Sequence, residues 1–198
     1  MTLGDTIVAP ATPFGHSGVA VIRITGPQSF SIIHHLSKKH RFINRHATVC
    51  SIVDSDGKTI DTSVVTVYKK PDSYTGEDVV EISSHGNPTT VQCITSSACA
   101  AGARAAEAGE FTKRAFINGK LDLVQVEAVA SLIDSKSIEN TRHQQKILRG
   151  VLSRSINNIR TSLISLLGRL EHQMDIDCLL YTSPSPRDLS TSRMPSSA

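Results

Sequence analysis

The sequence predicts an α+β fold: a mixed sheet with flanking helices, followed by an incomplete all-α helical bundle. In the N-terminal part, short apolar runs alternate with segments that open on proline and have helical spacing. From Leu121 onward, apolar residues recur every three or four positions, which is the period of a helix. Hydrophobic residues make up 39% of the 198 residues, enough for a buried core in one or two domains.

Short runs rich in β-branched residues predict the strands of the sheet. They lie at residues 6–11, 19–24, 46–54, 62–68 and 78–83. A turn-rich loop separates the first two runs. Between the third and fourth, Asp56-Gly57 supplies the positive φ values that a tight hairpin turn needs.

Two helices are predicted among these strands. Pro27 opens the first, over residues 27–37, at a position where its missing N–H costs nothing. Asn87 caps the second, over residues 88–101, and Pro88 occupies its first turn. Because strands and helices alternate closely, we expect the helices to lie on the faces of the sheet.

A stripe of leucine and isoleucine predicts one continuous helix over residues 141–174. Gly150 and Gly168 would each cost that helix about 1 kcal/mol relative to alanine. A helix of this length needs partners, and the sequence offers only one more, at residues 121–132. We therefore expect an unfinished bundle whose exposed leucines promote oligomers.

These patterns divide the chain into three parts. Residues 1–118 form the predicted N-terminal domain, and residues 119–177 begin the helical domain. Residues 178–198 are rich in serine and proline and have no apolar period, so we expect a disordered, non-native tail.

Composition narrows the possible partners. The formal net charge of +3 does not by itself mark a nucleic-acid binder. Tryptophan is absent and aromatic residues make up 4%, which argues against an extended base-stacking surface. Any contact with RNA would therefore have to come from a local patch.

Cellular location follows from what the sequence lacks. No apolar run approaches the roughly 18 residues of a membrane span, and the N-terminus has no leader-like pattern. The four cysteines have no zinc-ligand spacing, so we expect buried free thiols and no metal site. We expect a cytoplasmic protein that does not associate with membranes.

Three charged residues are candidates for a binding site. Arg23 and Glu81 each lie inside an apolar strand, where a charge is expensive unless it is paired. One reading is that they pair with each other, or that they lie at strand ends in contact with water. The other is that both line a polar hollow that holds a ligand. Lys120, after the Asn118-Gly119 turn, could supply a second positive charge, although its spacing also fits a solvated lysine.

Other motifs carry less information about function. No periodic template explains residues 109–123 as a simple helix face, although Glu110, Lys113 and Arg114 fit the solvated face of a short helix at their i, i+3 and i+4 spacing. Gly57-Lys58-Thr59 resembles the end of a Walker A loop, but Ile52 stands where the first glycine is needed. We therefore expect this chain alone neither to bind nor to hydrolyse GTP, and we assign no catalytic residue.

Three runs resemble one known family in their order and spacing. They are residues 18–24, the Tyr74-Thr75-Gly76-Glu77-Asp78 turn with its strand to residue 82, and residues 109–123, which end in Gly119-Lys120-Leu121-Asp122-Leu123. Together they are similar to the N-terminal part of the tRNA modification GTPase family (MnmE, also called TrmE). The resemblance extends over residues 5–177.

The resemblance implies an aminomethyltransferase-like N-terminal domain that binds 5-formyl- or 5,10-methylene-tetrahydrofolate and forms a homodimer. A GTPase domain that uses GTP, Mg and K is inserted in the helical domain of full-length members, and this chain lacks it. With a flavin-containing partner protein, the family modifies the wobble uridine of tRNA. The folate supplies the one-carbon unit.

By position, the family's folate contacts fall on Arg23, Glu81 and Lys120, all retained in type. The resemblance therefore favours the polar hollow. Two alternatives stay open: a folate-dependent aminomethyltransferase-like enzyme, which would need a catalytic acid, and a dimerisation module without a ligand.

Overall fold

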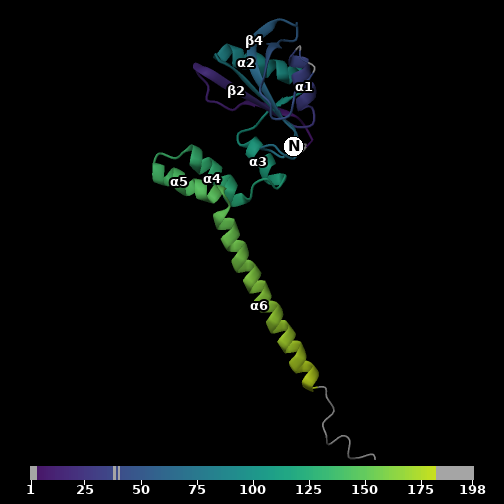
Figure 1. Cartoon of the computed structure of the whole chain (residues 1–198), viewed down its shortest axis with the longest axis vertical. Helices are drawn as coiled ribbons and strands as arrows, with labels where there is room; N and C mark the ends of the chain where they lie inside the picture. The colour runs from purple at the N-terminus through teal and green to yellow at the C-terminus, as the bar shows by residue number, and fades with distance from the viewer. Residues whose placement is uncertain (1–3, 38, 40, 182–198) are drawn as a thin grey trace, which may run out of the picture. The chain divides into compact units, whose positions relative to one another are not determined.

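The computed structural model describes residues 4–37, 39 and 41–181, and the side chains of the last helix as far as residue 174. The chain forms two compact units that divide between Asp134 and Ser135. The first unit contains the sheet, and the described part of the second contains two helices, drawn in green to yellow in Figure 1.

The sheet has six strands within the described part of the chain. They are β1 (Ile7–Pro10), β2 (Ser17–Thr25), β3 (Thr48–Val53), β4 (Thr59–Tyr68), β5 (Val79–Gly86) and β6 (Arg104–Ala105). Their order is β3-β4-β5-β2-β1-β6, and every neighbouring pair is antiparallel except β1 with β6. The predicted mixed sheet of an α+β fold is confirmed.

All five predicted strands form, and β6 is an addition that the sequence did not reveal. Two residues are too few to show an alternating pattern. β6 nevertheless matters for the site, because Arg104 pairs in parallel register with Ile7 at the start of β1. Its side chain is thereby held close to the N-terminal end of the sheet.

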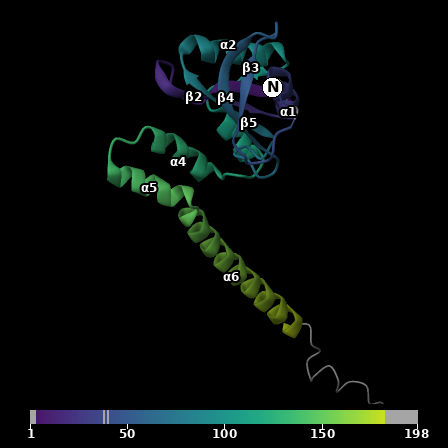
Figure 2. The same ribbon diagram turned by 45° about the horizontal axis from the view of Figure 1, so that its top comes forward.

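Helices α1 (Ser29–Leu36) and α2 (Pro88–Ala100) pack on one face of the sheet (Figure 2). They share one buried cluster with alternate residues of the central strands, such as Ile22, Ile24 and Ile82. As predicted, the Asn87 side chain caps α2, accepting a hydrogen bond from the Thr89 amide. The hydrophobic core therefore covers one face of the sheet, and the opposite face is available for other contacts.

Two further helices complete the first unit. α3 (Glu110–Ile117) follows Gly109, whose φ of 75° only glycine adopts readily. α4 (Leu123–Ile133) starts with a capping box, in which Asp122 and Gln125 satisfy each other's backbone amides. Because α4 starts so soon after α3, the turn that carries Lys120 is held at both ends.

The second unit contains α5 (Ile138–Leu148) and α6 (Val151–Tyr181). The single continuous helix predicted for residues 141–174 is therefore wrong. Gly150 has a φ of 71°, and its amide donates to the Ile147 carbonyl, which is how glycine commonly ends a helix. Gly150 is thus a terminator of α5 rather than a weak point within one helix.

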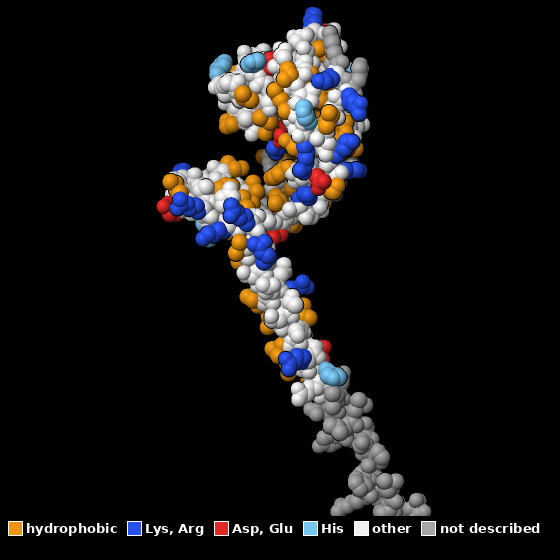
Figure 3. All heavy atoms as spheres, viewed as in Figure 1, with side chains coloured by type: hydrophobic (Ala, Val, Ile, Leu, Met, Phe, Trp, Pro, Cys, Tyr) orange, Lys and Arg blue, Asp and Glu red, His pale blue; other side chains and the backbone are white. Residues whose placement is uncertain are grey.

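The apolar residues of α6 are largely exposed (Figure 3). Leu163 and Leu170, seven residues apart on one side of the helix, are 60% and 52% exposed. The helical bundle itself stays a prediction, because among the described residues of its unit α6 packs against α5 alone. No helix of the described residues has a stretch long and apolar enough to cross a membrane.

The first residues of the predicted disordered tail are helical. The backbone of residues 178–181 continues α6, whereas disorder was expected from residue 178. Residues 182–198, where the rest of that prediction falls, lie outside the described residues.

The cysteines that the structure describes are free thiols, as expected. Cys50 and Cys99 are half-buried, but Cys93 is exposed on α2, so the prediction of a buried thiol is wrong there. An isolated cysteine in an amphipathic helix gives no sequence signal of which face it takes. Burial raises the pKa of the Cys50 thiol.

Candidate functional site

Two of the candidate residues, Arg23 and Glu81, face each other across neighbouring central strands. Arg23 of β2 is the register partner of Glu81 of β5. Arg23 Nε donates to Glu81 Oε1 at 2.9 Å, and Nη2 lies 2.7 Å from the same oxygen. The side chains stay 25% and 23% exposed, so the pair lies at a surface. The direct pairing considered from the sequence is present.

The pair lies on the sheet face opposite α1 and α2. Ile22 and Ile24 on either side of Arg23 point into the core, so Arg23 points the other way. The Tyr68 hydroxyl, at the end of β4, lies 3.4 Å from Glu81 Oε2. Burial and the nearby Glu81 charge raise the pKa of Tyr68, which keeps its hydroxyl protonated and able to donate.

Two aromatic rings lie against Arg23. Its guanidinium carbon is 5.2 Å from the centre of the Tyr74 ring and 5.7 Å from that of Phe111. These separations are those of cation–π contacts. The Tyr74 hydroxyl lies 2.9 Å from Thr112 Oγ1, which joins its loop to α3. A carboxylate, a guanidinium and aromatic rings therefore gather on one surface, a combination that suits a planar polar heterocycle.

Lys120 lies beside the same loop rather than against the ion pair. A Cβ built on Gly76 would come within 3.2 Å of Lys120 Cγ, and the φ of 77° at Gly76 also favours glycine. Asn118 Nδ2 donates to the Thr75 carbonyl at 2.7 Å and fixes the loop to the end of α3. In the described part of the chain, no contact joins Lys120 to Arg23 or Glu81.

A second ionic cluster, which the sequence did not reveal, holds α3 to the sheet. Arg114 is only 4% exposed and forms an ion pair with Asp5. Its Nη1 donates to the Asp5 carbonyl at 2.8 Å and to Glu77 Oε2 at 3.2 Å, and its Nη2 donates to Glu110 Oε1 at 3.2 Å. The buried guanidinium is thus satisfied from three segments of the chain.

Arg104 of β6 completes this cluster. It donates to Asp5 Oδ2 at 2.8 Å and to the two Glu110 oxygens at 2.7 and 3.1 Å. These bonds lower the pKa of Glu110 to about 2, and the bond from Arg104 lowers that of Asp5 as well.

The solvated helix face predicted for Glu110 and Arg114 is therefore wrong. Both side chains are buried, because their partners come from the start of β1, from β6 and from the turn before β5. A signal was present, since no helix periodicity explained residues 109–123. Spacing within one helix cannot, however, reveal partners that are distant in sequence.

This ionic cluster positions the candidate site. Glu77 also accepts a hydrogen bond from Thr25 Oγ1 at 3.0 Å, and Thr25 lies on the same face of β2 as Arg23. The Thr25 and Thr75 hydroxyls are 2.7 Å apart. The loop that carries Tyr74 and the helix that carries Phe111 are thereby fixed against the strand that carries Arg23.

Comparison with known proteins identifies the region. Residues 6–120 match the family model described as GTP-binding protein TrmE N-terminus, which is more than half of the chain. The chain belongs to this family. Arg23, Glu81 and Lys120 all lie inside the matched region, and the resemblance to the N-terminal MnmE/TrmE region is confirmed.

Relatives extend the match beyond the sheet. The tRNA modification GTPase MnmE of Francisella tularensis subsp. novicida (strain U112) is 47% identical over 171 residues, and that of Francisella philomiragia subsp. philomiragia is 46% identical over the same length. Each alignment covers 86% of this chain and 38% of the relative. The chain thus spans about two fifths of the length of these curated relatives.

Proposed function

We propose that the chain is the folate-binding, dimer-forming N-terminal region of a tRNA modification GTPase. In this proposal Arg23, Glu81 and Lys120 hold 5-formyl- or 5,10-methylene-tetrahydrofolate, which donates the one-carbon unit. The observation that carries the proposal is the contact of Arg23 with Glu81 beside two aromatic rings, on a sheet face that the core helices leave open.

The chemistry of Glu81 suits the aminopyrimidinone edge of a pterin. A carboxylate accepts two parallel N–H bonds from such an edge. Tyr68 reaches Glu81 Oε2 only at 3.4 Å, a long contact that a ligand N–H would replace. Oε1 would be shared with Arg23, whose other N–H groups would meet the pterin carbonyl oxygen.

The remaining groups fit the rest of the ligand. The Tyr74 and Phe111 rings offer apolar surface for a flat bicyclic ring. Lys120 would supply a positive charge for a folate carboxylate, and its alkyl chain is already packed beside Gly76. In this proposal the three residues hold the folate and do not transform it.

The open face of the sheet also supports a homodimer. Val49 and Val64 are register partners on β3 and β4, and both are exposed. A second copy covering this face would bury them close to the row that contains Glu81. GTP hydrolysis and modification of tRNA with a flavin-containing partner are proposed for the whole family protein, to which this region would contribute the folate.

Calorimetric titration of the purified chain with 5-formyl-tetrahydrofolate tests the proposal. We expect Glu81→Gln and Arg23→Gln to weaken binding roughly tenfold or more, because each removes a charge-assisted hydrogen bond. Asp61→Asn is the matched control: Asp61 is also a strand carboxylate with a basic partner, His85 at 2.8 Å, and it should leave binding unchanged.

Several outcomes would change the assignment. Unaltered affinity in both site variants would remove Arg23 and Glu81 from the folate site. A dimer in sedimentation that Val64→Glu dissociates, with no folate binding, would favour the ligand-free module. Release of the one-carbon unit by the chain alone would favour the aminomethyltransferase-like enzyme.

A further inference from the structure

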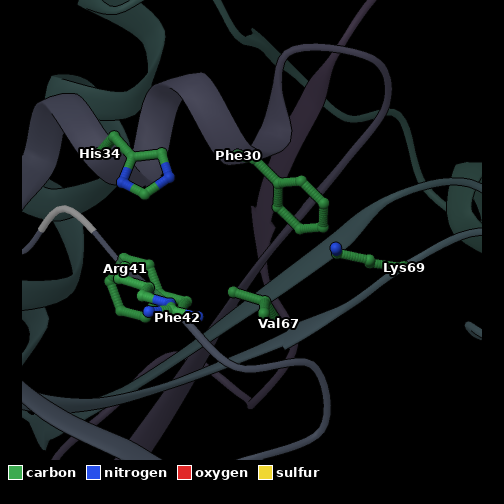
Figure 4. A pocket seen from close by; sticks show the side chains of 6 residues that line it. All are labelled: Phe30, His34, Arg41, Phe42, Val67 and Lys69. Atoms are coloured by element: carbon green, nitrogen blue, oxygen red, sulfur yellow. The ribbon is translucent and has the colours of Figure 1, made fainter.

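A separate cavity of about 230 Å³ lies between α1 and the end of β4 (Figure 4). It is lined by Phe30, His34, Arg41, Phe42, Val67 and Lys69. Val67 belongs to the buried face of the sheet, whereas Arg23 and Glu81 point from the opposite face. The cavity is therefore distinct from the candidate folate site.

The cavity is positively charged. His34, Arg41 and Lys69 carry basic nitrogens, and none of the six lining residues is acidic. Within the described residues, the charged ends of Arg41 and Lys69 form no ion pair, so both remain available to an anion. Among the described residues 39 and 41–46, Lys39 and Arg45 are also basic and none is acidic, which adds to the local positive potential.

The cavity also has aromatic walls. Phe30 and Phe42 are half-buried and pack against the hydrophobic core, so their rings are held by the fold rather than free. The Phe42 ring lies 5.5 Å from the His34 ring, centre to centre, and Val67 adds apolar surface between the walls, as Figure 4 shows. Such walls accept a flat, uncharged ring.

Hydrogen bonds join the chain segments that carry Arg41 and Lys69. The Lys69 amide donates to Asn44 Oδ1 at 3.0 Å, and the Arg45 amide donates to the Val67 carbonyl at 2.8 Å. Arg45 Nη2 also reaches the Asp72 carbonyl at 2.8 Å. The segment that carries Arg41 is thus tied to the strand end that carries Lys69.

We propose that this cavity binds an unpaired nucleotide of RNA, with the base between the phenylalanine rings and the phosphate at Arg41 and Lys69. A nucleotide combines a flat base with an anionic phosphate. Proteins bind single-stranded nucleic acids with aromatic and basic side chains of this kind. The cavity is smaller than typical drug-sized sites, in keeping with one nucleotide. That the nucleotide belongs to an RNA, rather than being free in solution, rests on the proposed function.

Binding of the full chain to an oligouridine of about ten nucleotides tests this inference. Arg41→Glu and Lys69→Glu should each weaken binding several-fold. Each should also reduce the slope of log affinity against log salt, because the phosphate loses one of its two cationic partners. Phe42→Leu keeps an apolar side chain without the ring and should weaken binding about fivefold.

Lys58→Glu is the matched control, because Lys58 precedes β4 whereas Lys69 follows it, at the opposite end of the same strand. Equal losses in Lys58→Glu and Lys69→Glu would overturn the inference, since they would indicate unspecific charge attraction. A strand of abasic sites that binds as tightly as oligouridine would overturn the base contact. Uridine monophosphate that binds as tightly as the strand would overturn RNA as the source and assign a free nucleotide.

The folate titration separates this inference from the proposed function. Arg41→Glu should bind 5-formyl-tetrahydrofolate as the unaltered chain does, because the two sites lie on opposite faces of the sheet. If the unaltered chain binds folate but Arg41→Glu and Lys69→Glu leave oligouridine binding unchanged, only the RNA site is overturned. A chain that binds oligouridine at this cavity but no folate overturns the folate proposal and leaves the nucleotide site standing.

Discussion

At the scale of single residues, the distinction that matters is between a partly exposed ion pair and a buried one. Arg23 and Glu81 are about a quarter exposed, so their mutual attraction adds little stability and either can turn to a ligand. Arg114 is almost fully buried, so each of its partners compensates a large loss of hydration. The first pair is suited to binding and the second to holding the fold.

Replacing Arg114 by methionine should therefore destabilise the first unit strongly. Asp5 and Glu77 would lose their common buried cation, and the free energy of unfolding should fall by about 3–5 kcal/mol. Urea denaturation measures the change. The exposed Lys58→Met should shift the same quantity by less than about 0.5 kcal/mol, and a comparable loss in both variants would contradict the role of burial.

The depressed pKa of Glu110 predicts an acid-dependent stability. Hydrogen bonds from Arg104 lower this pKa from an ordinary 4.5 to about 2 in the folded protein. A carboxyl with a lowered folded pKa stabilises above its unfolded pKa, and the contribution disappears as pH falls through the folded pKa. We expect a loss on the order of 2–3 kcal/mol between about pH 4.5 and pH 2.

Glu110→Gln tests this dependence through urea denaturation at several pH values. The variant should be less stable at neutral pH and should lose less stability on acidification, because it has no carboxyl to protonate at this position. Parallel pH curves for the two proteins would show that other groups govern the acid sensitivity.

At the scale of elements, the same residue type acts in opposite ways in two positions. Gly150 has a positive φ and ends α5, whereas Gly168 lies inside α6 with open space around it. A glycine inside a helix weakens it, but a glycine after the last turn adopts the left-handed conformation that other residues resist. Sequence spacing alone treats the two alike.

Alanine at each glycine should change stability with opposite signs. Gly150→Ala forces a side chain into a left-handed conformation and should destabilise the α5–α6 connection by about 1–2 kcal/mol. Gly168→Ala should stabilise α6 by about 1 kcal/mol. Thermal melts followed by circular dichroism measure both. A gain in helix content and stability in Gly150→Ala would instead support one continuous helix.

At the scale of the molecule, the exposed apolar side of α6 is the feature most in need of a partner. Leucines repeat along the described part of the helix and remain about half exposed. Burying such a surface is favourable, so chains should associate through it. This association is separate from the dimer proposed for the open face of the sheet.

Charges on the α6 stripe should therefore reduce self-association. We expect Leu163→Glu with Leu170→Glu to lower the average mass in sedimentation at high concentration, because burying the new carboxylates is costly. Asn157→Glu, also exposed on α6, is the control for added charge. An unchanged mass distribution in the double variant would show that α6 does not drive association.

Several features were accessible from the sequence because they depend on neighbours in the chain. Short runs rich in β-branched residues located five strands, and Asn87 with Pro88 located the start of α2. The charges of Arg23 and Glu81 inside apolar strands marked the candidate pair, since such residues need a partner. The sequence did not reveal β6, because a strand of two residues is too short to show a pattern. It did not reveal the break at Gly150 either, because Gly150 and Gly168 have the same sequence signature.

What the sequence by itself determined is the α+β class, the family and the identity of the candidate binding residues, because apolar runs, capping residues and short motifs can be read directly along the chain. Only the tertiary structure decided that Arg23 meets Glu81 beside Tyr74 and Phe111, and that Arg114 is buried. Those contacts join segments far apart in the chain, and their energies depend on distance and burial in space. The spacing of residues along the sequence gives neither the distance between two side chains in space nor their burial.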